Sequence, residues 1–127
     1  MEKILSKSKI AEWKNFGKAD EVRQFPNGRL ELMKIGGATI GRAIFEPGWR
    51  WSECIKPLVG TDSCQLRHAG IVQSGRMHVT HDDGTELEIG PGQTYVIEPG
   101  HDAHVVGNEP LLGFEFESAT AEEFARG

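Results

Sequence analysis

Short runs of alternating polar and apolar residues, each ended by a turn, recur along most of the chain. Alternation with a period of two is typical of β-strands, because successive side chains point to opposite faces of a sheet. The turns are rich in Gly, Pro, Asn and Asp, the residues that tight turns prefer, as in Asp82-Asp83-Gly84 and Gly90-Pro91-Gly92. This pattern predicts strands over residues 29–35, 38–45, 63–73, 76–80, 86–89, 93–98, 104–106 and 111–117.

Helical patterns are expected only near the two ends of the chain. Residues 8–16 are predicted to form a short helix, with Ser8 as its N-cap. Near the other end, Thr120-Ala121-Glu122-Glu123 has the pattern of a capping box that opens a short helix through Phe124. Residues 17–28 are expected to be a connector. Because no helix separates the strands, a parallel βαβ architecture is excluded, and a sandwich or a closed double-sheet barrel remains.

Composition agrees with this fold class and limits the partners and the cellular location that we expect. The 127 residues suit one domain, and 16 Gly with 6 Pro favour an all-β protein with many turns. A net charge of −5, with both signs interspersed, gives no indication of a nucleic-acid partner. No apolar run approaches the roughly 20 residues of a membrane span, so no membrane partner is expected. Residues 1–7 are too polar for a secretory signal, and we therefore expect a cytoplasmic protein.

Candidate metal ligands gather in the second half of the chain. Cys64 and His68 have equal parity along the strand predicted there, so they are expected to share a face, with Asp62 if the strand begins that early. A barrel interior that also receives His101 or His104 would gather thiolate and imidazole donors, which suit Zn, Fe, Ni or Cu better than Mg or Ca. The hypothesis is a divalent transition metal site formed by Cys64, His68 and one or both of these histidines. In the alternative, His68 is a hydrogen-bonded pocket residue and Cys64 a small core hydrophobe.

Aromatic residues provide candidates for a ligand pocket. Trp49 and Trp51 have equal parity, so their rings are expected to line the mouth of a barrel and hold an apolar or planar ligand, or else to be buried in the core or at a subunit interface. Tyr95 offers either a pocket hydroxyl or a core ring. His78 alternates with apolar neighbours and is expected to face solvent, and His81 belongs to a turn. Neither of these two histidines is expected to bind a metal.

The order of turns and the histidine after the last one resemble the cupin superfamily over about residues 38–117. In the second cupin motif, Gly92 is followed after five residues by Glu98-Pro99-Gly100, with Glu98 in place of the first Pro. In that motif a His follows the last Gly after two residues, and an Asn follows the His after three. His104 comes one position later than this, but three residues separate it from Asn108, as in the motif. His101 is the other candidate for the motif's histidine. In the first motif, His68 stands at the Glu position relative to Gly75, and Asp62 and Cys64 stand in place of His-x-His.

This resemblance implies an all-β double-stranded β-helix, that is, a cupin-like jelly-roll barrel over residues 38–117. An N-terminal extension over residues 1–37 would hold a short helix and the first strand, and residues 118–127 a short C-terminal helix. The resemblance also implies a homodimer. Two functions follow from it. The first is a metal-dependent oxygenase, isomerase or lyase that acts on a small organic ligand, and the alternative is a non-enzymatic small-molecule sensor or binding module that has lost the metal.

Overall fold

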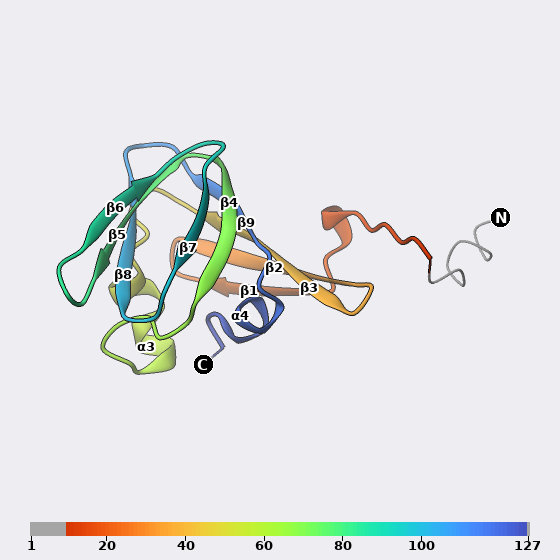
Figure 1. Ribbon diagram of the computed structural model, residues 1–127, viewed down its shortest axis with the longest axis horizontal. Helices are drawn as coiled ribbons and strands as arrows, with labels where there is room; N and C mark the ends of the chain where they lie inside the picture. The colour runs from red at the N-terminus through yellow and green to blue at the C-terminus, as the bar shows by residue number, and fades with distance from the viewer. Residues whose placement is uncertain (1–9, 127) are drawn as a thin grey trace.

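Two antiparallel β-sheets make up the body of the protein (Figure 1). The computed structural model describes residues 10–126. Six strands form one sheet in the order β1-β2-β3-β9-β4-β7, and three form the other in the order β6-β5-β8. The strands are β1 (Glu21–Phe25), β2 (Gly28–Ile35), β3 (Ala38–Phe45), β4 (His68–Ser74), β5 (Arg76–His81), β6 (Glu86–Ile89), β7 (Thr94–Ile97), β8 (His101–Val106) and β9 (Leu111–Glu115).

The strand order confirms the expected double-stranded β-helix. Strands β3 and β4 do not pair with each other, because β9 lies between them and pairs with both. A chain that returns in this way encloses one interior between two sheets, as in a jelly roll. The interior is filled by apolar side chains from both sheets, and Leu30, Leu32, Val72 and Val79 are almost completely buried there. Each such side chain contributes about 1.5–3 kcal/mol of transfer free energy to the folded state.

Strand β1 lies in the stretch that was expected to be a connector, so that prediction is wrong. It pairs with β2 along its whole length, from Glu21 opposite Leu32 to Phe25 opposite Gly28. Only Phe25 of the strand is buried. Backbone pairing at the edge of the sheet therefore forms this strand, and an edge strand needs little of the apolar alternation that reveals a strand in a sequence.

The predicted helix over residues 8–16 is not formed by the part of it that the structure describes. Residues 10–15 have no helical structure, and one 3-10 turn, η1 (Phe16–Lys18), follows with the Asn15 side chain accepting the Gly17 N–H at 2.9 Å. Ile10 and Trp13 are 91% and 81% exposed. A helix this short depends on packing of its apolar face, and these side chains are not packed against the sheets.

Three short helices complete the described fold, and none of the described helices is long and apolar enough to cross a membrane. Helices α2 (Trp51–Cys54) and α3 (Lys56–Val59) lie between β3 and β4. Helix α4 (Ser118–Glu123) confirms the expected C-terminal helix. It begins two residues before Thr120, so the capping box is wrong. The Thr120 hydroxyl instead donates to the carbonyl oxygen of Arg67.

The C-terminal segment is anchored on the barrel. The Arg23 guanidinium donates to the Phe124 carbonyl oxygen at 2.7 Å and to that of Ala121 at 3.4 Å. The Phe124 ring is buried and packs against two other rings. Its centroid lies 6.1 Å from that of Phe25 and 6.2 Å from that of Phe45. The residues after α4 therefore form part of the wall around the barrel interior.

Candidate metal centre

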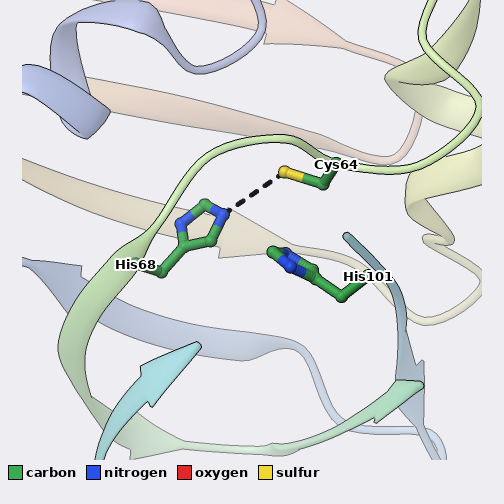
Figure 2. A group of neighbouring side chains, drawn as sticks. All are labelled: Cys64, His68 and His101. Atoms are coloured by element: carbon green, nitrogen blue, oxygen red, sulfur yellow. Dashed lines mark hydrogen bonds between the residues drawn. The ribbon is translucent and has the colours of Figure 1, made fainter. Parts of the chain in front are cut away.

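Three buried side chains with metal-binding atoms meet at one end of the barrel: Cys64, His68 and His101 (Figure 2). His68 opens β4 and His101 opens β8. Cys64 lies on the loop before β4, which is attached to β8 by the Cys64 N–H donating to the His101 carbonyl oxygen at 2.8 Å. The Cys64 Sγ is 3.4 Å from His68 Nε2, and the three candidate ligand atoms all lie within 4.8 Å of one another.

In His68 and in His101, the ring nitrogen that is not a candidate metal ligand, Nδ1, is hydrogen-bonded within the protein. His68 Nδ1 lies 2.5 Å from Glu115 Oε1, and His101 Nδ1 lies 2.8 Å from the Glu98 carbonyl oxygen. A carbonyl oxygen only accepts, so His101 Nδ1 carries a proton, and in the neutral ring Nε2 has a lone pair that can bind a metal ion. Hydrogen bonds of this kind fix the ring orientation of metal-binding histidines and raise their basicity. Both rings are therefore positioned as they are in metal sites.

Glu115 is a site residue that the sequence analysis missed. Its Oε1 contacts His68, and its Oε2 accepts the Tyr95 hydroxyl at 2.8 Å. Glu115 is buried on β9, and both it and Tyr95 lie opposite Gly70 of β4 in the sheet register. The carboxylate thus links His68, at the start of β4, to Tyr95 on β7. Burial and the neighbouring Glu115 charge raise the pKa of Tyr95, so its hydroxyl remains a donor.

The site favours a thiolate beside an imidazolium when no metal is bound. Burial opposes ionisation of Cys64, but hydrogen bonds from His101 and His68 outweigh it and lower the pKa of the thiol to about 6. Burial likewise opposes the charge on His68, but its contacts with Cys64 and Glu115 raise the pKa of the imidazole. At neutral pH the thiolate, the form that binds metals, is therefore the main state of Cys64.

We predict that Cys64 of the metal-free protein titrates near pH 6, rather than near the value of about 8.5 of a free cysteine. The measurement is the ¹³Cβ chemical shift of Cys64 against pH. Replacing His68 by glutamine removes a positive charge beside the thiolate, so the transition is expected to move to higher pH. A transition close to 8.5 in the unaltered protein would show that the two histidines do not stabilise the thiolate.

The three side chains fit a transition metal ion. In a tetrahedral zinc site with bonds of about 2.3 Å to sulfur and 2.0 Å to nitrogen, the two ligand atoms lie roughly 3.5 Å apart, close to the 3.4 Å between Cys64 Sγ and His68 Nε2. Thiolate and imidazole donors suit zinc, iron, nickel or copper. Three protein ligands also leave a coordination position open for water or a substrate, as in catalytic sites.

His104, the fourth metal candidate from the sequence, is not part of this group. Side chains alternate along β8, so that His101, Ala103 and Val105 are buried while His104 is on the other face. There its ring is 5.3 Å from the ring of His78, its cross-strand neighbour. The strand was predicted to begin at His104, but β8 begins at His101. His101 is therefore a strand residue, and its side chain is on the buried face. Among the described residues only Cys64, His68 and His101 form such a ligand group.

The aromatic pocket candidates line a cavity beside the two histidines. Trp49, Trp51 and Tyr95 all contribute to its wall, together with His68 and His101. Trp49 is buried and stacked on Phe45 with ring centroids 4.0 Å apart. The cavity has a volume of about 50 Å³, and one water molecule needs roughly 10–15 Å³. The barrel interior therefore has room for only a few non-hydrogen atoms next to the metal-binding side chains.

The fold occurs in several solved structures. An ectoine synthase from P. lautus is 11% identical with a TM-score of 0.62, covering 90% of this chain and 87% of that one. A cupin-superfamily sugar phosphate isomerase from Silicibacter pomeroyi is 14% identical with a TM-score of 0.58, covering 82% and 73%. A protein of unknown function from Rhizobium leguminosarum is 19% identical with a TM-score of 0.59, covering 84% and 97%. No protein-family model and no curated protein matches the chain.

At these identities the likeness shows the fold alone. It confirms the resemblance to the cupin superfamily as a resemblance of fold. What the site can do has to be argued from the residues of this chain.

Proposed function

We propose that the barrel binds one divalent transition metal ion through Cys64 Sγ, His68 Nε2 and His101 Nε2, with a small organic ligand beside it. The observation that carries this proposal is the convergence of three buried ligand atoms, in which each imidazole already uses its other nitrogen for a hydrogen bond. Thiolate and imidazole atoms that converge in this way can all coordinate one transition metal ion.

The cavity indicates what the organic ligand has to offer. Its walls are mainly aromatic and aliphatic, which favours an apolar or planar group. The buried indole N–H of Trp49 has no acceptor among the described residues. Such an orphaned donor costs about 1–3 kcal/mol, and an acceptor oxygen on the ligand would satisfy it. The ligand is therefore a small molecule that carries at least one carbonyl, carboxylate or hydroxyl oxygen.

The site supports an enzymatic function as isomerase, lyase or oxygenase. A metal bound there supplies Lewis acidity or a centre for oxygen activation. Glu115 holds the His68 ring in place, Tyr95 holds Glu115, and the aromatic walls exclude bulk water from the reacting atoms. An isomerase and a synthase are among the proteins that share this fold, and they support catalysis on a small molecule.

The test compares two histidines on opposite faces of one strand, His101→Ala and His104→Ala. Zinc-loaded proteins without an affinity tag are freed of excess metal, and zinc per chain is measured by mass spectrometry. We expect zinc in the unaltered protein and in His104→Ala, and almost none in His101→Ala. The loss should exceed the roughly 10–100-fold drop in affinity that follows removal of an outer hydrogen-bond partner.

Thermal unfolding of the metal-free forms serves as the control, because it separates a loss of ligand from a loss of fold. Equal zinc content in two folded variants would refute the metal site. If zinc is bound and a panel of small carbonyl compounds is bound but never converted, the protein is a binding module rather than an enzyme.

A further inference from the structure

The face of the six-stranded sheet that points away from the barrel interior is apolar over β4, β7 and the end of β9. Ile71 of β4 lies opposite Phe114 of β9, and Ala69 lies opposite Val96 of β7. Phe116, just after β9, donates its N–H to the Ala69 carbonyl oxygen at 2.9 Å. Phe116 is 55% exposed and Val96 is 53% exposed. A sheet face that meets water ordinarily carries polar side chains, so these five residues, the outer sheet face, have the character of a covered surface.

The chain itself covers one part of the outer sheet face. The Phe16 ring of η1 packs on Phe114 with ring centroids 5.7 Å apart, and the Arg42 guanidinium lies 4.8 Å from the centre of the Phe16 ring. This cover lies over the middle of the sheet. Phe116 and Val96 remain exposed beside it.

Residues 10–15, the N-terminal arm, present a second apolar feature. The Gly36 N–H donates to the Glu12 carboxylate at 3.3 Å, and the Lys14 ammonium donates to the Lys34 carbonyl oxygen at 2.9 Å. Both contacts fasten the arm to the end of the β2–β3 hairpin, and Figure 1 shows that the arm leads away from the two sheets. Trp13 lies between the two anchors and is 81% exposed. The arm therefore holds an indole ring in solvent instead of packing it on its own sheet.

From these two features we infer that the chain forms a two-fold symmetric dimer, in which the N-terminal arm of each copy packs Trp13 against the outer sheet face of the other. A two-fold contact is self-complementary, so a single chain has to supply both of its sides. This chain supplies a held aromatic ring and, beside Phe16, an uncovered apolar surface for a ring. The inference goes beyond the proposed function and does not depend on a metal ion.

The exposed area also suits a second copy. An aromatic side chain buries about 150–250 Å² when it is fully covered, so Trp13 and Phe116 together present roughly 250–300 Å² at their exposed fractions. Each partner in a standard interface buries about 800 Å². The two rings thus provide about a third of that area, and the sheet surface around Val96 and Ile71 adds to it. Tryptophan is also among the residues that most often dominate the free energy of binding.

The first test measures the mass of the protein by sedimentation over a wide range of concentration. We expect a dimer that dissociates on dilution. Trp13→Ala and Phe116→Glu should each raise the Kd of the dimer at least about tenfold. Leu58→Glu is the matched control and should leave the Kd unchanged, because Leu58 is an apolar residue of similar exposure, 44%, that lies on helix α3 and not on the sheet.

The second test asks whether the arm is at the contact. The chain has three tryptophans, and Trp49 and Trp51 are only 2% and 3% exposed, so iodide quenches mainly the fluorescence of Trp13. Quenching should fall as the dimer forms, and Trp13→Phe should remove this dependence on concentration.

Three results would overturn the inference. The first is a protein that stays monomeric at every concentration, which would leave the outer sheet face to a different protein. The second is a dimer whose Kd changes no more in Trp13→Ala and Phe116→Glu than in Leu58→Glu. The third is a dimer in which iodide quenches Trp13 as strongly as in the monomer. The zinc content of the same samples is measured separately, so failure of the dimer and failure of the metal centre are distinguished.

Discussion

Replacement of Glu115 by glutamine is expected to weaken metal binding about 10–100-fold without loss of the fold. Glutamine has the same shape, so its amide oxygen still accepts from His68 Nδ1. It lacks the negative charge, which raises the pKa of His68 through a hydrogen bond and a charge interaction. A less basic imidazole is a weaker ligand for a divalent cation. The measurement is zinc affinity by competition with a chromophoric chelator.

The matched control for this substitution is Glu117→Gln. This substitution removes the same charge at a position two residues away. The Glu117 carboxylate pairs with Arg67 at 2.9 Å and not with the candidate metal ligands. Its zinc affinity should stay close to that of the unaltered protein. If both substitutions lower zinc affinity equally, the effect is one of net charge, and Glu115 has no specific role in positioning His68.

Replacement of Gly70 by alanine is expected to destabilise the fold by about 3 kcal/mol, the upper end of the usual cost of overpacking. A Cβ at this position would lie 2.1 Å from the Phe114 carbonyl oxygen and 2.7 Å from the Tyr95 hydroxyl. The first atom belongs to the backbone of β9, so relief of the clash requires that β4 and β9 move apart. Urea unfolding of the metal-free protein measures the loss.

Gly113→Ala is the control for Gly70→Ala, because Gly113 lies on the neighbouring strand β9. Its Cβ would meet the Ile71 carbonyl oxygen at 3.1 Å, which a small shift relieves. We expect a loss at least about 1 kcal/mol smaller than at Gly70, near the lower end of the same range. Similar losses at the two glycines would mean that the close approach at Gly70 does not limit the packing of β4, β7 and β9.

The site contains both histidine and carboxylate side chains, as the cupin motifs do, but at other positions of the chain. His68 stands where the first cupin motif has its Glu, and Cys64 stands at a His position. The carboxylate comes instead from Glu115 on β9, behind the His68 ring. The two motif regions together therefore bring three candidate metal ligands close to one another, and a thiolate among them would favour softer metal ions.

The sequence by itself determined the fold class and two of the three metal candidates. Alternation of period two and the Gly- and Pro-rich turns revealed most strands, because both are local consequences of backbone geometry. Cys64 and His68 were expected to share one face of a strand over residues 63–73, but that strand is wrong for its first five residues, because β4 begins at His68 and Cys64 lies on the loop before it. Trp49, Trp51 and Tyr95 were recognised as pocket candidates, and all three line the interior cavity.

Only the tertiary structure decided between His101 and His104 and revealed Glu115. The two histidines have opposite parity, so one strand presents only one of them to the interior, and the pairing of His101 with Cys64 and His81 sets which one. On β9 the apolar residues Leu112 and Phe114 face outward, while Leu111, Gly113 and Glu115 face inward, and the exposed Phe116 follows the strand. Local pattern favours the opposite face. Burial of the carboxylate depends on His68 and Tyr95, which come from distant parts of the chain and meet it only in the folded barrel.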